Sequence, residues 1–203
     1  GVNGAFANIA AQRIFPSTRC IPYADFKAAY RAVEKGECDC VVLPIENSFN
    51  GDVGNVLDLA FFGSLYINGV YEAEVVQNLL GVKGASISDI KKVISHPQAL
   101  GQCATYIEKH DFETEDAVNT AVAAKMVAEN GDKTVAAIGS VKAAEQFGLQ
   151  VISEKINDSG ANTTRFAVFS RSNRKPTPLD DRFIMLFTVK NTAGSLGEAI
   201  SVI

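Results

Sequence analysis

Apolar positions along the chain follow two alternating patterns. Short runs rich in β-branched residues alternate with longer stretches in which apolar side chains recur every three or four positions. One such stretch, from Phe26 to Val33, predicts a helix that Asp25 opens and that stops near Gly36. The run CDCVVLPI, residues 38–45, follows and predicts a strand. Helices that alternate with strands favour an α/β fold built on a parallel sheet.

The same order of elements returns in the second half of the chain. Residues 117–131 predict a helix that ends at Gly131, residues 134–138 a buried strand, and residues 139–148 the next helix. The two halves share little identity, but the common order suggests two similar lobes.

Two β-rich segments would carry the chain between these lobes. Residues 71–82 lead from the first lobe to the second, and residues 154–169 lead back. Two crossings predict a hinge with a cleft between the lobes. After the polar, proline-bearing segment 170–181, residues 182–190 predict a separate strand and residues 195–203 the start of a helix.

The composition of the chain indicates which kinds of binding partner to expect. The chain has 203 residues, of which 47% are hydrophobic, so it can bury a core. Its formal net charge is -4, and lysine and arginine are scattered, which argues against nucleic acid and favours a small-molecule partner. No apolar run approaches the roughly 18 residues of a membrane helix, and no signal segment opens the chain, so we expect a cytoplasmic protein that binds no membrane.

The cysteines and histidines do not predict a metal site. Cys38 and Cys40 form a C-x-C pair, which would share one face of a strand, and Cys20 and Cys103 stand apart. We expect four free thiols in a reducing compartment. The isolated histidines and the missing G-x-G-x-x-G spacing predict neither a metal nor a nucleotide cofactor.

Polar clusters fall where predicted strands lead into helices, at residues 1–6, 44–54, 95–103 and 138–142. Ligands of open α/β sheets bind at such strand ends, and helix N-termini favour anions. The pattern therefore predicts a site for a small anion such as a carboxylate or phosphate.

Simpler interpretations exist for single residues. Asn47 and Ser48 could cap a helix, and the His96 ring could bond locally in a turn. Gln98 and Gln102 could both face solvent. The glycosylation pattern at Asn162 would require a secreted chain, so we regard it as chance. These interpretations leave the co-occurrence of the clusters unexplained.

Three strings in order, PIENSFNGDVGNVLDL (44–59), SHPQALGQC (95–103) and NTTRF (162–166), resemble the signatures of the prephenate dehydratase family. The resemblance implies two α/β lobes, similar to type II periplasmic binding proteins, with a cleft between them, followed by an α+β ACT domain that binds phenylalanine. It implies the decarboxylating dehydration of prephenate to phenylpyruvate in phenylalanine biosynthesis, without metal or cofactor.

The resemblance also implies a domain layout. It comprises a catalytic region at 1–173 (lobe one about 1–75 and 156–173, lobe two about 76–155), a linker at 174–181, and an incomplete ACT domain at 182–203.

Site residues follow from the resemblance by position. Thr164 would hydrogen-bond or protonate the leaving hydroxyl, although the sequence shows no group that polarises it. Arg165 would bind a substrate carboxylate, and Glu46 would orient its neighbours. The remaining implied residues are Asn47 and Gln102 for catalysis, Ser48, Ser95 and Thr163 for substrate binding, and Gly194, Ser195 and Leu196 for the effector.

Some features depart from the family or leave alternatives. Val2 and Ala7 replace a proline and a hydroxyl residue of the N-terminal turn. The substrate could instead be arogenate, or the chain could be a non-catalytic binding protein for a small carboxylate. A chorismate mutase domain could precede Gly1. Family resemblance further suggests a homodimer or homotetramer with L-phenylalanine as effector.

Overall fold

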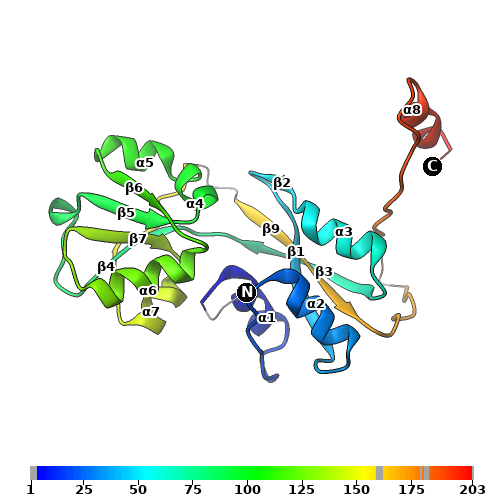
Figure 1. Cartoon of the computed structure of the whole chain (residues 1–203), viewed down its shortest axis with the longest axis horizontal. Helices are drawn as coiled ribbons and strands as arrows, with labels where there is room; N and C mark the ends of the chain where they lie inside the picture. The colour runs from blue at the N-terminus through cyan, green and yellow to red at the C-terminus, as the bar shows by residue number, and fades with distance from the viewer. Residues whose placement is uncertain (1–3, 159–161, 179, 181–182, 203) are drawn as a thin grey trace. The chain divides into compact units, whose positions relative to one another are not determined.

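The computed structural model describes residues 4–158, 162–178, 180 and 183–202 (Figure 1). The chain divides into two compact units, Gly1–Asn173 and Arg174–Ile203. The predicted turn at residues 1–6 lies only partly within the described residues, and Val2 lies outside them.

The first sheet of the larger unit is antiparallel throughout. Its order is β2-β1-β9-β3, and its strands are β1 (Cys40–Asn47), β2 (Gly51–Asp52), β3 (Tyr66–Glu74) and β9 (Thr163–Ser170). β9 pairs antiparallel with both β1 and β3. The prediction of a parallel sheet is therefore wrong here, because the returning segment inserts between two strands that precede it by more than 80 residues.

The second sheet is mixed. Its order is β6-β5-β7-β4-β8, and its strands are β4 (Asn78–Gly81), β5 (Lys92–Ser95), β6 (Glu113–Asp116), β7 (Val135–Gly139) and β8 (Gln150–Ser153). β5 runs parallel to β6 and β7, whereas β4 runs antiparallel to β7 and β8. The α/β class is confirmed, with parallel pairing confined to three strands.

The helices begin and end largely where local signals predict. They are α1 (Phe6–Ile14), α2 (Phe26–Glu34), α3 (Gly54–Phe62), α4 (Pro97–Gly101), α5 (Ala104–Lys109), α6 (Thr120–Asn130) and α7 (Val141–Phe147), with a 3₁₀ turn at Ile87–Asp89. Asp25 caps α2 by accepting a hydrogen bond from Ala28 N at 2.7 Å. Gly131 ends α6 at φ 71°, a left-handed conformation that suits glycine.

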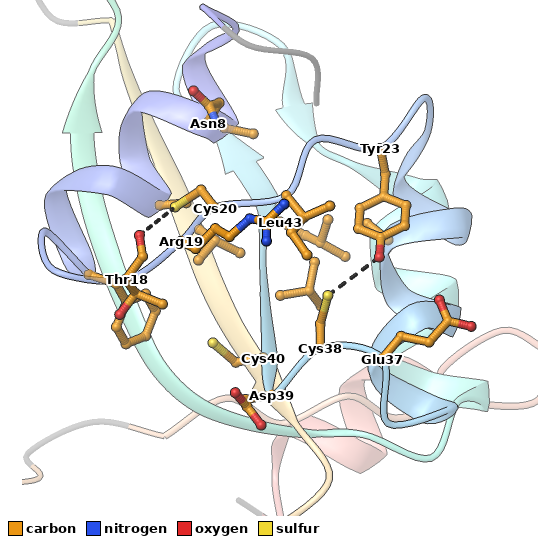
Figure 2. A pocket seen from close by; sticks show the side chains of 17 residues that line it. Asn8, Thr18, Arg19, Cys20, Tyr23, Glu37, Cys38, Asp39, Cys40 and Leu43 are labelled. Atoms are coloured by element: carbon orange, nitrogen blue, oxygen red, sulfur yellow. Dashed lines mark hydrogen bonds between the residues drawn. The ribbon is translucent and has the colours of Figure 1, made fainter.

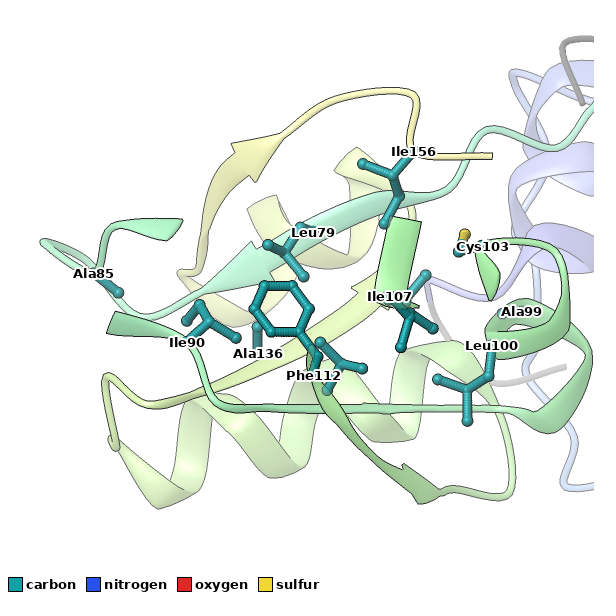
Figure 3. Packing of buried hydrophobic residues seen from close by; sticks show 12 residues of the cluster. Leu79, Ala85, Ile90, Ala99, Leu100, Cys103, Ile107, Phe112, Ala136 and Ile156 are labelled. Carbon is teal, nitrogen blue, oxygen red and sulfur yellow. The ribbon is translucent and has the colours of Figure 1, made fainter. Parts of the chain in front are cut away.

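Helices cover both faces of each sheet. In lobe one (the first sheet with α1–α3), Leu43 and Phe169 pack with side chains of α2 and α3, whereas Val42 and Phe166 on the opposite face pack against α1. In lobe two (the second sheet with α4–α7), one cluster gathers Leu79, Ile107 and Phe112 (Figure 3), and the other contains side chains of α6 and α7.

The two crossings between the lobes lie side by side. Val75 N donates to Asn162 O at 2.7 Å, and Ile156 N donates to Gln77 O at 2.9 Å. Ser140, before α7, adds a contact between the lobes by donating from Oγ to Gly4 O at 3.1 Å.

The smaller unit contains α8 (Ser195–Ile200), which confirms the predicted helix start. The predicted strand at 182–190 is wrong for its described part, 183–190, which forms no strand. A strand needs a hydrogen-bonded neighbour, and among the described residues of this unit none pairs with it. Its apolar side chains are exposed, including Phe183 at 81%.

All four cysteines are free thiols, as predicted. The C-x-C pair does not share a strand, because β1 begins at Cys40 and Cys38 precedes it. Burial raises the pKa of the Cys103 thiol to about 12. Across the described part of the chain, no helix is both long and apolar enough to cross a membrane.

Candidate active site

Asn47 and Thr164 stand opposite each other on β1 and β9. Asn47 Nδ2 donates to Thr164 Oγ1 at 2.9 Å, to Asn162 Oδ1 at 2.9 Å and to Thr163 O at 3.2 Å. Thr164 is only 7% exposed. Because its oxygen already accepts from an amide, its own proton is free to be donated elsewhere, and the incoming N–H makes the hydroxyl a better donor.

The same two motifs meet again just beyond Asn47. Ser48 N donates to Thr163 O at 2.9 Å, and Thr163 N donates to Ser48 Oγ at 3.0 Å. Asn47 Oδ1 accepts from Phe49 N at 3.0 Å, which fixes the turn after β1. The ENS and NTTRF segments therefore form one hydrogen-bonded unit.

This geometry overturns the helix-cap interpretation. α3 begins at Gly54 after Val53, so Asn47 and Ser48 lie several residues before the helix. Their polar atoms hold a turn and the start of β9 instead.

Arg165 lies on the other face of the first sheet, because neighbouring residues of a strand point to opposite faces. Its guanidinium donates to Glu46 Oε2 at 3.0 Å and to Glu72 Oε1 at 2.9 Å. These contacts, with Glu72 contributing most, raise the pKa of Arg165 above its ordinary value. A register shift between Pro44 and Glu46 aligns Glu46 with Arg165. The structure thus does not bring Arg165 and Glu46 together with Thr164.

The two candidates of lobe two are buried. Ser95, at the end of β5, donates from Oγ to Ile138 O of β7 at 2.7 Å. Gln102 follows α4, and its Oε1 accepts from Gln77 Nε2 at 3.1 Å. The expectation that Gln102 faces solvent is wrong, whereas Gln98 is exposed.

His96 behaves as the local interpretation predicts. Its Nδ1 accepts from Gln98 N at 3.2 Å and caps α4. Throughout the described residues, no group of three or more His, Cys, Asp or Glu side chains is arranged to hold a metal ion.

Two residues at the crossings were not assigned a role from the sequence. Gln77 and Asn162 are 2% and 4% exposed. Each has one buried polar atom, Gln77 Oε1 and Asn162 Nδ2, that finds no hydrogen-bond partner among the described residues. Burying an unpaired polar group costs about 1–3 kcal/mol, a cost that is typical of functional sites. The sequence nevertheless offered an indication for both residues. Asn162 is the first residue of the NTTRF string, and Gln77 is a polar residue within the largely apolar run VVQNLLG.

Amide contacts connect these residues across both crossings. Gln77 N donates to Asn157 Oδ1 at 2.8 Å, and Asn157 Nδ2 donates to Val75 O at 3.2 Å. Val75 N in turn bonds Asn162 O. A continuous set of hydrogen bonds thus leads from Gln102 in lobe two to the strand that carries Thr164.

Two cavities of the larger unit do not include Thr164, Asn47 or Gln102. One of about 200 Å³ in lobe one is lined by Arg19 and by the three thiols of Cys20, Cys38 and Cys40, among others (Figure 2). There the hydroxyl of Tyr23 and Cys38 Sγ lie 3.4 Å apart. The other, of about 550 Å³, lies between the lobes and is bordered by Phe6, Glu74 and Lys142, among others.

The effector candidates lie at the start of α8. Gly194 precedes the helix at φ 90°, Ser195 bonds Thr192 through its hydroxyl, and Leu196 is exposed.

Comparison with solved structures defines the class of protein. A prephenate dehydratase from Arthrobacter aurescens, in complex with L-Phe, matches with a TM-score of 0.80 at 31% identity, covering 87% of this chain and 60% of that chain. GqqA, described as a novel type of quorum quenching acylase, matches with a TM-score of 0.79 at 32% identity, covering 88% of this chain and 64% of that chain. The α/β fold, with one antiparallel and one mixed sheet, is therefore that of prephenate dehydratase structures.

Sequence comparison identifies the family. The prephenate dehydratase family model matches residues 1–174. Arogenate dehydratase/prephenate dehydratase 1 of Arabidopsis thaliana, named as chloroplastic, is 37% identical over 203 residues, which is 100% of this chain and 52% of the relative. The chain belongs to the prephenate dehydratase family, lyases of aromatic amino acid biosynthesis. It spans about half the length of this curated relative.

Proposed function

We propose that the protein converts prephenate to phenylpyruvate. The observation that carries the proposal is the contact between Asn47 Nδ2 and Thr164 Oγ1 at 2.9 Å, inside a motif pair of this family. Because the Thr164 oxygen accepts this hydrogen bond, its hydroxyl can donate its own proton toward the substrate. The reaction needs such a donor at the oxygen that departs.

The reaction couples two departures from one ring. The carboxylate leaves as CO₂, and its bonding electrons complete the aromatic ring as the C–O bond to the hydroxyl breaks. The departing hydroxide takes up one proton and leaves as water. A threonine hydroxyl is a weak acid, so we assign Thr164 a hydrogen bond that strengthens as charge develops on this oxygen, with the proton finally supplied by solvent.

The other candidates take supporting roles. Asn47 orients and polarises Thr164, while Ser48 and Thr163 hold the turn at the substrate's first-lobe side. Gln102 supplies the second lobe's contact, and Ser95 fixes the end of β5 beneath it.

Arg165 and Glu46 receive a different role from the one that the resemblance implied. The guanidinium already faces two carboxylates, and a dianionic substrate would be repelled by the surplus negative charge. We assign Arg165 to holding β1, β9 and β3 together through Glu46 and Glu72, on the face away from Thr164.

Regulation and location complete the proposal. We infer that L-phenylalanine is the effector, bound by an ACT domain in which Gly194, Ser195 and Leu196 take part, and that the protein is a homodimer or homotetramer. L-Phe in the Arthrobacter complex supports the effector. Four free thiols suit a reducing compartment, and we propose the cytoplasm.

Arogenate is the second candidate substrate. The Arabidopsis relative carries both activities in its name. Arogenate differs only by an amine in place of the keto group, so the same ring chemistry would yield phenylalanine directly. Parallel assays with each substrate, compared by kcat/KM, decide between them.

The decisive experiment pairs Thr164→Val with Thr164→Ser. Valine keeps the shape of threonine but lacks its hydroxyl, so kcat for phenylpyruvate formation should fall by about 100-fold or more, while serine should stay within about tenfold of the parent. The assay runs at neutral pH, because acid aromatises prephenate spontaneously. Thr114→Val, on an exposed strand position, should leave kcat unchanged. Prephenate binding without turnover in the parent protein would instead identify a binding protein.

A further inference from the structure

Gln77 is anchored at three points where the crossings meet lobe two. Its backbone N donates to Asn157 Oδ1, its backbone O accepts from Ile156 N, and its side-chain Nε2 donates to Gln102 Oε1. We propose that Gln77 is a positioning residue of the site, which fixes the Gln102 amide with its NH₂ group toward the substrate. The inference rests on the proposed function and adds a residue to it.

The contact decides which end of the Gln102 amide is available. A glutamine side chain presents an acceptor oxygen on one side and a donor NH₂ on the other. Gln77 occupies the oxygen, and Gln102 Nε2 has no hydrogen-bond partner among the described residues. A donor suits a dianionic substrate, whereas a rotated amide would present its oxygen and repel a carboxylate.

Packing does not explain a glutamine at position 77. Its side chain is 2% exposed and its Oε1 has no partner among the described residues, so an apolar side chain of the same length would bury no unpaired atom of its own. The surrounding segment, VVQNLLG, is otherwise largely apolar. What a glutamine provides at this position, and an apolar side chain would not, is the hydrogen bond from Nε2 to Gln102.

A double-mutant cycle tests the coupling. Gln77→Met keeps an unbranched side chain of similar length but cannot donate to Gln102. In the parent background we expect kcat/KM for prephenate to fall by about tenfold, with most of the loss in kcat. In a Gln102→Leu background the same change should alter kcat/KM by less than about twofold, because the amide that Gln77 orients is gone.

Controls separate positioning from stability. Gln150 is a partly buried glutamine of the same lobe whose Nε2 donates to Ala85 O, so Gln150→Met should change the thermal midpoint but leave kcat/KM within about twofold. Gln77→Leu provides a second variant if Gln77→Met folds poorly. Two outcomes with an active parent would overturn this inference and leave the proposed function intact. In one, Gln77→Met keeps the kcat/KM of the parent. In the other, Gln77→Met lowers kcat/KM equally in the parent and Gln102→Leu backgrounds. An inactive parent would overturn the proposed function with it.

Discussion

At the scale of single residues, the orientation of the Asn47 side-chain amide determines the direction in which the Thr164 hydroxyl donates its proton. Asn47 donates to Thr164 Oγ1 from Nδ2, and its Oδ1 is occupied by the backbone N–H groups of Phe49 and Asn50. The two ends of the side chain therefore have fixed and different partners. Reversing the donor end should reverse the direction of the Thr164 hydroxyl.

Asn47→Asp tests this directly. A carboxylate has the same shape but accepts only, so Thr164 would donate its proton to the introduced carboxylate rather than to the substrate. We expect kcat to fall by about 100-fold. Asn55→Asp is the matched control, because Asn55 is an exposed amide in the first turn of α3 and the change should retain kcat within about twofold. Turnover by Asn47→Asp near the parent rate would contradict the role of the Asn47 amide.

At the scale of elements, the first sheet separates the candidate site from the contacts that hold lobe one together. Asn47 and Thr164 are cross-strand neighbours, as are Glu46 and Arg165 on the other face. On that other face, the hydroxyl of Tyr30 in α2 accepts from Leu65 N at 2.9 Å, just before β3. A change there should affect stability more than turnover.

Tyr30→Phe is the corresponding test. It keeps the ring that packs edge-on against Phe169 at 5.6 Å but leaves the Leu65 N–H unpaired and buried. A loss of about 1–3 kcal/mol should lower the thermal midpoint by about 3–8 °C while kcat is retained. Tyr23→Phe, which removes only a contact with a thiol, should shift the midpoint less. Equal shifts in the two variants would argue against the Tyr30 anchor.

Local signals predicted the elements better than their pairing. The Asp25 cap and the Gly131 end lie within a few residues of the helices they bound, so the sequence reveals them. The insertion of β9 between β1 and β3 depends on contacts more than 80 residues apart, which no local pattern encodes.

The candidate site shows the same division. Motif resemblance named Asn47 and Thr164, but it also assigned Arg165 to a substrate carboxylate, although neighbouring residues of a strand point to opposite faces. The unpaired atoms of Gln77 and Asn162 could not be predicted, because pairing depends on neighbours brought together by the fold.

At the scale of the larger unit, the two lobes differ in whether their strands are continuous along the sequence. All five strands of the second sheet come from one continuous stretch between Asn78 and Ser153. Lobe one is split, because β9 follows lobe two in the chain and fills the centre of the first sheet. We therefore expect lobe two to form without lobe one, whereas lobe one requires the chain on both sides of lobe two.

Truncation after Asp158 tests this asymmetry. The fragment 1–158 keeps every residue of both clusters of lobe two. It lacks β9, so β1 and β3 lose their shared partner and Leu43 loses Phe169. We expect native amide signals from lobe two, rapid proteolysis within residues 5–74, and no turnover, since Thr164 is absent. The fragment 75–158 alone should unfold cooperatively, as domains of this size can. Protected amides in β1 and β3 of the fragment 1–158 would show that lobe one folds without its central strand.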